Sequence, residues 1–333
     1  MCYTLRNFLK QLPSPHQAAK MAALPRGAIL PSMWDVLGLG AVAVDDLLYV
    51  DRYPDADEKE PVRDKRREGG GLAGTALVAA ARLGAGAAYC GALGDDELSR
   101  FTRIELEREG VDCSPVLFDA AARPMHSVIV VVRPTGQRTI YAAREGWREI
   151  DPELVTPELV ARCRVLFVDH TVPLSGVRAA MEARKLGIPV VADIERLDEP
   201  GIAELLNCVD HLILSRRTAL ELTGKIGPEN AVRALLEPGR AVAVVTDGQH
   251  GCWYAAQGEA VRHQPAFEVR VVDTTGCGDV FHGAYAACLA RGLSLDAAIR
   301  TAAACAALKA MQPGGRRGIP SAETVEAFLA ASN

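Results

Sequence analysis

The chain has 333 residues, of which 49% are hydrophobic and 24% charged, so it carries enough apolar material for a large core. This composition excludes both a disordered tail protein and a small protein held together by disulfides. The 37 lysines and arginines against 42 aspartates and glutamates give a formal net charge of −5, and the longest basic cluster is Lys65–Arg67, which argues against a nucleic-acid partner.

The first predicted element is an N-terminal segment over residues 1–33. Several prolines interrupt any helical period there, and the first strand-like run begins only at Trp34. We therefore expect residues 1–33 to form a loose extension in front of one domain over residues 34–330.

From Trp34 onward, β-branched apolar runs alternate with stretches of helical period rich in Ala, Leu, Arg and Glu. Buried parallel strands joined by crossover helices produce this pattern, so we expect an α/β core with a mostly parallel central sheet. The predicted strands are 35–40, 165–169, 189–193, 211–215 and 241–246, and the predicted helices are 72–84, 97–110, 176–187 and 219–224.

Two segments, about 46–68 and 123–145, break this alternation. The first contains a short strand-like run and then a Pro-Asp-Ala-Asp turn, and the second reads as a hairpin whose turn is Pro134-Thr-Gly136. We expect both segments to build a small separate sheet that acts as a lid over the core. Exposed edges of that lid predict a homodimer.

The most informative segment, 273–279, reads Asp-Thr-Thr-Gly-Cys-Gly-Asp and runs into a helical stretch. Gly276 and Gly278 let the backbone turn closely into the helix, so that unpaired amides there point at one spot, which favours anions. Asp279 stands in the first helical turn, where it can receive a proton from a substrate hydroxyl. We therefore predict an anion hole made by Gly276, Cys277 and Gly278, with Asp279 as general base.

This segment resembles the Asp-Thr-x-Gly-Ala-Gly-Asp signature of the ribokinase-like (PfkB) carbohydrate kinases, with Cys277 in the alanine position. The resemblance covers residues 35 to about 330 and implies a three-layer α/β/α core with a small β-sheet lid. It also implies an enzyme that uses ATP and Mg²⁺ to phosphorylate a primary hydroxyl of a small sugar or sugar-like substrate. The string that begins at His263 resembles the ketose kinase and sulfofructose kinase branch.

Several residues are predicted to bind the sugar. The glycine-rich element over residues 69–75 is similar to the family's Gly-Gly-x-x-x-Asn motif, which implies that Gly70, Gly71 and Thr75 meet sugar hydroxyls. The resemblance also implies that Asp45 accepts hydrogen bonds from two sugar hydroxyls. The turn at Gly91–Asp96 matches another family motif, in which Asp96 is predicted to cap a helix.

Two further candidates for substrate binding have simpler alternatives. Lys59 lies in the predicted lid and could equally be a solvated lysine of a turn. His170 follows a predicted strand, at the edge where an open α/β sheet presents its ligands, but a neighbouring turn could satisfy its ring.

The nucleotide-binding residues are implied by the resemblance alone. The turn Thr246–Gly251 is similar to the one in which glycine backbone approaches nucleotide phosphates, and the stretch 303–320 is similar to the helix and loop on the adenine side. The predicted nucleotide-binding residues are Ser215, Thr246, Gly248, Gly251, Ala304 and Gly315.

Metal binding is less well defined by the sequence. The resemblance implies that Asp273 and the loop 313–320 hold a monovalent cation such as K⁺, and within that loop Arg316 and Arg317 either face solvent or take part in the site. The family's Asn-x-x-Glu motif is replaced by Ser-Arg-Arg-Thr at 215–218, and a second acidic motif is altered to Asp-Ile-Glu-Arg at 193–196. Glu195 or Asp193 is therefore predicted to act on Mg²⁺ through water.

Other functions are excluded or left open by the motifs. No Walker A sequence occurs, which excludes P-loop kinases. The Gly38-x-Gly40-x-x-Ala43 string resembles a dinucleotide fingerprint, but strand formers follow it where a helix is required. Two alternatives remain: a nucleoside kinase of the same fold, with Trp147, Tyr141 and Phe167 available to stack a base, and a catalytically silent sugar- or nucleotide-binding regulator.

The cysteines and the apolar runs indicate the compartment. The nine cysteines are odd in number, scattered and without a Cys-x-x-Cys pair, which is typical of buried apolar residues in a reducing environment. No run approaches about 18 uninterrupted apolar residues. We expect a cytoplasmic protein with no membrane partner.

Overall fold

The computed structural model describes residues 34–332, so the predicted extension over residues 1–33 lies outside the described residues. Within residues 34–332, nine strands form the central sheet: β1 (Trp34–Leu39), β4 (Ala87–Cys90), β6 (Val111–Asp112), β10 (Cys163–Asp169), β11 (Val190–Asp193), β12 (His211–Ser215), β13 (Val242–Thr246), β14 (Cys252–Ala256) and β15 (Arg262–Gln264). Their order is β15-β14-β13-β12-β11-β10-β1-β4-β6. Pairing is parallel from β13 to β6 and antiparallel at β14 and β15.

Helices cover both faces of this sheet because each strand is apolar on both sides. Along β10, Val165 and Phe167 pack in one hydrophobic core, and the alternating residues Leu166 and Val168 pack in the other. The helices that contribute to the first core are α3 (Leu72–Arg82), α4 (Glu97–Arg108), α10 (Cys277–Ala290), α11 (Leu295–Ala310) and α12 (Ala322–Ala331). Those of the second core are α5 (Pro157–Val160), α6 (Pro173–Leu186), α7 (Ile202–Cys208), α8 (Arg216–Thr223) and α9 (Pro228–Leu235). The expected three-layer α/β/α core is confirmed.

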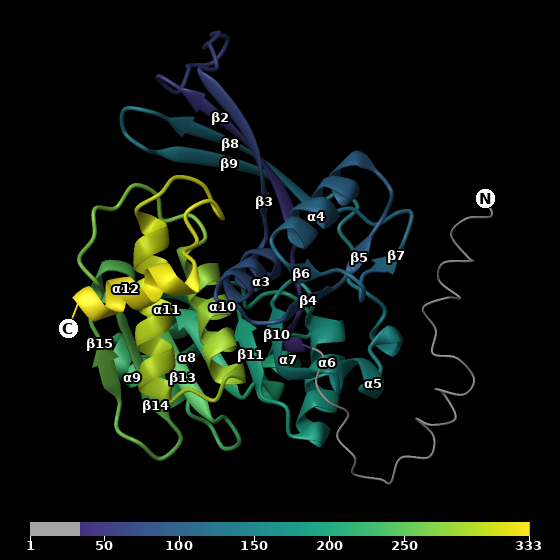
Figure 1. The fold of residues 1–333 in the computed structure, drawn as a ribbon, viewed down its shortest axis with the longest axis vertical. Coiled ribbons are helices and arrows are strands. Elements are labelled where there is room, and N and C mark those ends of the chain that lie inside the picture. Colours follow the sequence, from purple (N-terminus) through teal and green to yellow (C-terminus); the bar gives the residue numbers. More distant parts are fainter. Residues whose placement is uncertain (1–33, 333) are drawn as a thin grey trace. The chain divides into compact units, whose positions relative to one another are not determined.

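A second sheet stands apart from the central one (Figure 1). Among the described residues its four strands are β2 (Ala43–Val50), β3 (Asp64–Gly70), β8 (Met125–Val132) and β9 (Arg138–Ala143), in the order β3-β2-β8-β9. β8 and β9 form the predicted antiparallel hairpin, and β2 pairs with β3 antiparallel and with β8 parallel. This small sheet is called the lid below. A homodimer through its edges stays a prediction.

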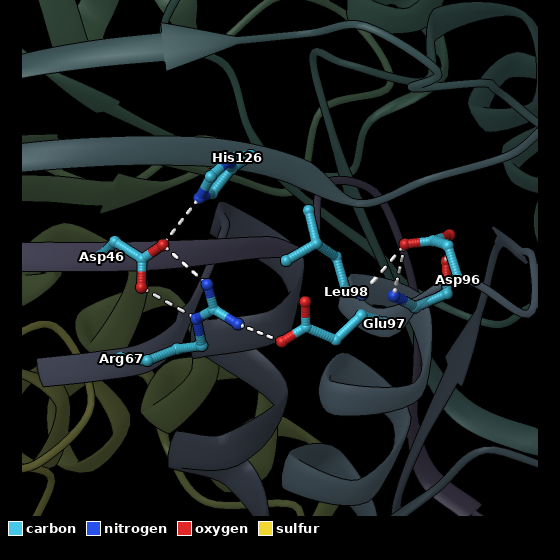
Figure 2. A network of polar contacts seen from close by, with 7 residues as sticks. Asp46, Arg67, Asp96, Glu97, Leu98 and His126 are labelled. Atoms are coloured by element: carbon cyan, nitrogen blue, oxygen red, sulfur yellow. Dashed lines mark hydrogen bonds and ion pairs between the residues drawn. The ribbon is translucent and has the colours of Figure 1, made fainter.

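A polar network fastens the base of the lid to the helix α4 (Glu97–Arg108), as Figure 2 shows. The Arg67 guanidinium donates to both carboxylate oxygens of Asp46 at 2.8 Å and to Glu97 at 2.6 Å, and the His126 ring lies 3.0 Å from Asp46. The Arg67 hydrogen bonds lower the pKa of Asp46 to about 2. Three lid strands and one core helix therefore meet in a single charged cluster.

Local sequence signals account for several element boundaries. Asp96 accepts hydrogen bonds from the amides of Leu98 and Ser99, which confirms it as the N-cap of α4. The helix predicted from residue 176 begins earlier, at Pro173, because proline fits the first turn of a helix.

The remaining elements of the described chain are short. They comprise β5 (Ala92–Leu93) and β7 (Leu117–Phe118), which pair with each other, and the 3₁₀ turns η1 (Pro152–Leu154) and η2 (Gly248–His250). No helix of the described residues is long and apolar enough to cross a lipid bilayer.

Candidate active site

The start of α10 presents backbone amides that can donate hydrogen bonds. Gly276 has the left-handed φ of 74°, and a Cβ there would lie 2.9 Å from the Gly315 carbonyl oxygen, so the turn needs glycine. Within residues 34–332, no hydrogen bond engages the amides of Gly276, Gly278 or Asp279. The Cys277 amide instead donates to the Thr274 carbonyl at 3.2 Å. Of the amides at 276–279 that were expected to be unpaired, that of Cys277 is therefore engaged within the turn, and those of Gly276, Gly278 and Asp279 are free among the described residues. We call these three free amides the cradle.

The Asp279 carboxyl lies among other acids at the carboxyl ends of two strands. Asp169 ends β10 and Asp193 ends β11, and the two residues are directly paired in the sheet register. Burial is the largest of the causes that raise the pKa of Asp279 well above its ordinary value. The charges of Asp193, Glu195 and Asp169 raise this pKa further, and the Arg316 charge opposes the shift. Burial and Glu195 likewise raise the pKa of Asp193. Neighbouring acids thus disfavour the ionised form of Asp279.

His282 connects this cluster to the sheet. Its Nδ1 atom lies 2.8 Å from the Gly278 carbonyl oxygen and 3.3 Å from the Asp193 carboxylate, and its Nε2 atom lies 3.1 Å from the Ile213 carbonyl oxygen. Burial lowers the pKa of His282. The ring therefore holds the first turn of α10 against the strand ends.

The predicted sugar residues gather where β2 and β3 leave the core. A Cβ on Gly70 would lie 2.2 Å from an Asp45 carboxylate oxygen, so glycine at 70 leaves the room that Asp45 occupies. Gly71 has a φ of 85°, and a Cβ there would lie 2.5 Å from the Ala41 carbonyl oxygen. Burial raises the pKa of Asp45, while Ser127 and Arg316 lower it. Asp45 and Gly70 are thus brought together.

Arg316 is a central residue that the sequence left undecided. Its side chain is only 6% exposed, its Nε atom donates to the Thr75 hydroxyl at 3.3 Å, and its Nη2 atom donates to the Gly70 carbonyl. No ion pair to Arg316 occurs among residues 34–332. Burial lowers its pKa to about 10, and Asp45 and Asp279 counteract that effect. Arg316 therefore belongs to the site, whereas Arg317 is exposed.

Asp169 fastens the glycine-rich loop to the sheet. One carboxylate oxygen accepts from the amides of Ala41 at 2.7 Å and Ala73 at 3.2 Å, and the other accepts from the Thr171 amide at 2.8 Å. A Cβ on Gly40 would lie 2.1 Å from Asp169, which explains the glycine there. Because β2 rather than a helix follows Gly40, the dinucleotide fingerprint is excluded. The acid after the apolar run 165–168 was the only sequence signal for Asp169.

The two uncertain substrate candidates have different positions. His170 follows β10, is buried, and accepts a hydrogen bond at Nδ1 from the Glu195 amide at 3.4 Å. The segment after β11 thus holds the His170 ring, and contact of His170 with substrate stays a prediction. Lys59 is exposed in the loop between β2 and β3, and it makes no hydrogen bond or ion pair with the other candidate residues of the described chain. The structure does not bring Lys59 to the cradle.

A cavity of about 440 Å³ lies at the carboxyl ends of β12 and β13. Ser215 and Thr246 are paired in the sheet register, which brings two predicted nucleotide residues together. Ser215 also caps α8 by accepting from the Thr218 amide at 3.3 Å. Sequence reasoning gave no role to the two arginines there. The lining residues are Ser215, Arg216, Arg217, Thr246, Asp247, Gly248, Gln249 and His250.

Three predicted nucleotide residues lie elsewhere. Ala304 is fully buried in the core, so its predicted nucleotide contact is wrong: the face of α11 that it occupies packs inward. Gly251 lies in a turn where a Cβ would come 2.0 Å from the Gln264 carbonyl oxygen, which explains the glycine by close packing. Gly315 packs against Gly276, beside the cradle.

The donors around Asp273 do not fit the predicted monovalent cation. Its Oδ1 atom accepts from the Thr275 amide at 2.8 Å and hydroxyl at 2.7 Å, its Oδ2 atom accepts from the Gly314 amide at 2.9 Å, and its backbone carbonyl accepts from Lys309 at 2.9 Å. Burial would raise the pKa of Asp273, but the hydrogen bonds and the Lys309 charge lower it. Each oxygen of Asp273 thus already accepts a hydrogen bond from the protein.

The acids near Asp279 do fit a magnesium ion. Mg²⁺ is usually held by one or two carboxylates together with substrate phosphates and water. Within residues 34–332, Asp193 and Glu195 make no ion pair with a lysine or arginine. A divalent cation would offset the repulsion between these carboxylates. No group of three or more metal-binding side chains occurs in the described chain. Protein ligands alone would therefore not complete the coordination.

Comparison with known proteins identifies the family. A family model described as pfkB family carbohydrate kinase matches residues 37–322. The ATP-dependent ribose-1-phosphate kinase of Halopiger xanaduensis is 31% identical over 300 residues, which cover 88% of this chain and 97% of that protein. The ribokinase of Haemophilus influenzae is 27% identical over 303 residues, covering 87% and 97%.

A solved structure agrees with these matches. Arabidopsis thaliana ribokinase complexed with ribose and ATP has a TM-score of 0.77 at 24% identity, covering 89% of this chain and 98% of that one, and so shares the fold. The signature at 273–279 and the α/β core with its separate lid both lie within the matched residues. The chain therefore belongs to the pfkB family of carbohydrate kinases, as an ATP-dependent enzyme.

Proposed function

We propose that this kinase transfers the terminal phosphoryl group of ATP to a primary hydroxyl of a small sugar, with Asp279 as the general base. The observation that carries the proposal is the position of Asp279 in the first turn of α10, beside the free amides of the cradle. The dipole and the unpaired N–H groups of a helix start attract negative charge. Asp279 would take the hydroxyl proton where the phosphoryl charge is best stabilised.

The energetics favour the cradle as the larger contributor. The transition state of phosphoryl transfer is loose, so the hydroxyl proton leaves late and a carboxylate is a sufficient base. One preorganised donor contributes about 3 kcal/mol, which corresponds to roughly a hundredfold in rate. The raised pKa of Asp279 makes its ionised form a stronger base than an ordinary carboxylate.

The remaining groups around Asp279 would bind the sugar, the nucleotide and the metal ion. Asp45 and Gly70 would hold the sugar, and the cavity at Ser215 and Thr246 would hold the nucleotide, with Arg216 close to its phosphates. Asp193 and Glu195 would hold Mg²⁺, which would neutralise phosphate charge when bound. The lid would exclude water, which competes as a phosphoryl acceptor.

Two alternatives receive less support. A nucleoside kinase needs an aromatic face for the base, yet Phe167 is fully buried in the core and Trp147 is half-buried against both hydrophobic cores. Tyr141 is exposed on the lid, where its hydroxyl contacts Tyr53. A catalytically silent regulator would have no need for a carboxyl group whose ionisation is unfavourable beside a free cradle. Both features favour a sugar kinase.

We further propose that the sugar carries an anionic group such as a phosphate or sulfonate. Arg316 is a buried guanidinium without an ion pair in the described chain, and it contacts the loop that would hold the sugar. A buried cation is costly unless an anion or several acceptors compensate it. The relative named ATP-dependent ribose-1-phosphate kinase agrees with such an acceptor.

A second cavity of about 450 Å³ reaches Arg316 from the β3 edge of the lid. Six arginines and three glutamates line it, but Arg66 and Arg67 already pair with acids outside the lining. Arg316 and Arg317 are the lining arginines without an ion pair in the described chain, and an anionic substituent would offset their charge. Its lining residues are Arg66, Arg67, Glu68, Gly69, Arg82, Glu105, Arg108, Glu109, Arg316 and Arg317.

The test measures ADP release with pairs of neutral and phosphorylated sugars. We expect turnover with ribose 1-phosphate or a ketose phosphate that retains a primary hydroxyl, and none with ribose 5-phosphate, whose primary hydroxyl is blocked. Arg316→Gln should raise KM for the anionic sugar by about tenfold or more and leave a neutral sugar within about threefold. Preference for the neutral sugar would overturn the anionic assignment only, whereas no ADP release with any sugar would overturn the kinase proposal itself.

A further inference from the structure

Lys309 is a fully buried lysine at the end of α11, directly below the segment that leads into the cradle. Its side chain has 0% exposure, and its ammonium donates to the Asp273 backbone carbonyl at 2.9 Å. Burial lowers the pKa of Lys309, while the nearby Cys277 and Asp273 raise it. A lysine buried this deeply needs a compensating partner. Asp273 supplies that partner.

The surroundings fix Lys309 and Asp273 relative to each other. The amides of Val272 and Asp273 both donate to the Ala310 carbonyl at the end of α11, at 2.7 and 3.1 Å. A lysine in the last turn of a helix also interacts favourably with the helix dipole. From the lid, Arg138 reaches Asp273 with an N···O distance of 3.3 Å. The segment 272–275 is thus held by fixed cations and amides.

We propose that the Lys309 ammonium is a built-in substitute for a monovalent metal cation, so that this kinase needs neither K⁺ nor Na⁺. Asp273 was the predicted cation ligand, but its carboxylate and carbonyl oxygens already accept from Thr275, Gly314 and Lys309. The ammonium supplies one positive charge behind the turn that presents the cradle. Its role is to position that turn, and it does not touch the reacting atoms.

This inference rests on the proposed function only for its activity measurement. The cradle depends on the conformation of the turn at Gly276, and Asp273 is tied to that turn through the Thr275 amide and hydroxyl. Losing the ammonium would leave the Asp273 carbonyl without its donor and would let the turn relax. A bound metal cation could then restore the charge in the space that Lys309 leaves.

The experiment compares wild type, Lys309→Ala and the exposed control Lys225→Ala in K⁺, Na⁺, NH₄⁺ or tetramethylammonium salts at equal ionic strength. Wild type and the control should show the same turnover in all four salts, within about twofold. Lys309→Ala should lose about tenfold or more in turnover in tetramethylammonium and recover part of it in K⁺ or NH₄⁺. A lysine that only stabilises the fold would give a loss that no small cation reverses.

Thermal unfolding gives a second readout that does not depend on activity. We expect the Tm of wild type to be the same in K⁺ and tetramethylammonium, and that of Lys309→Ala to rise in K⁺. A wild-type turnover or Tm that increases strongly with K⁺ would overturn the proposal, even if Lys309→Ala fails to fold. Absence of any turnover would refute the kinase assignment while the Tm comparison still decides the role of Lys309.

Discussion

Asp273 and Asp279 stand at the two ends of one short turn, and their environments are opposite. Asp273 accepts hydrogen bonds from Thr275, Gly314 and Lys309, and its pKa is lowered. Asp279 faces other carboxylates beside free amides, and its pKa is raised well above the ordinary value. The same residue type thus holds the turn at one end and is left unsatisfied at the other.

The difference separates structural from chemical roles. A carboxylate whose lone pairs are all engaged cannot accept a proton without losing those hydrogen bonds. A carboxylate raised in pKa by burial and like charges is ready to accept one. Asp273 therefore orders the turn, and we assign the chemistry to Asp279.

A large loss of turnover, second only to that of Asp279→Asn, is expected from Gly278→Ala. A Cβ at residue 278 meets no atom within 4 Å, so the fold should tolerate it, but the methyl group would enter the space before the cradle. We expect turnover to fall about a hundredfold, the equivalent of one lost donor, with Tm unchanged. Steady-state kinetics and thermal unfolding measure the two quantities.

Gly276→Ala is the matched variant at the glycine of the turn where a side chain has no room. Its Cβ would lie 2.9 Å from the Gly315 carbonyl oxygen, and the left-handed φ disfavours alanine. Here Tm should fall together with turnover. Equal losses of Tm in the two glycine variants would contradict the difference in available space between residues 276 and 278.

A smaller effect, a gain in stability, is expected from Asp279→Asn. Because the pKa of Asp279 is raised by folding, its favourable contribution is present at low pH and is lost as pH rises through the folded pKa. Asp279→Asn removes this penalty, so the variant should unfold at a higher temperature than wild type near neutral pH. The gain should shrink as pH is lowered toward the range where Asp279 is protonated.

Asp273→Asn should behave in the reverse way. The lowered pKa of Asp273 means that its contribution is present above the unfolded pKa and lost as pH falls through the folded pKa. The variant should lose about 1 to 3 kcal/mol of stability near neutral pH, because partners such as Gly314 are left unsatisfied. Thermal unfolding across pH shows whether the two variants shift in opposite directions.

The smallest effect is expected from Cys277→Ala. The Cys277 amide is used inside the turn, and its thiol makes one weak contact, 3.5 Å from the Ala306 carbonyl oxygen. Alanine keeps the backbone, so turnover and Tm should stay close to wild type. A thousandfold loss of turnover would show that the thiol takes part in the reaction.

Features that depend on neighbouring residues could be predicted from the sequence. The helix start at 276–279, the N-cap Asp96 and the hairpin of β8 and β9 each follow from a few adjacent residues. Apolar runs predicted five of the nine described strands of the central sheet, β1, β10, β11, β12 and β13, because buried parallel strands read as continuous apolar segments. The three-layer arrangement was implied by the family resemblance.

Contacts between residues that are far apart in the sequence could not be predicted. Arg316 meets Thr75 across 241 positions of the chain, and Asp169 meets Ala41 across 128 positions. No local pattern reports which of two adjacent arginines turns inward. The error at Ala304 has a related cause: an alanine-rich helix has apolar residues all round, so its sequence does not define the buried face.

The most direct test of the account is the phosphoryl-transfer step itself in wild type and Asp279→Asn, measured by single-turnover quench with saturating ATP and sugar. Asp95→Asn, an exposed aspartate, is the control. We expect Asp279→Asn to slow transfer by about a thousandfold or more while ATP affinity stays within about twofold. Transfer by Asp279→Asn at a tenth of the wild-type rate would contradict the assignment of Asp279 as the base.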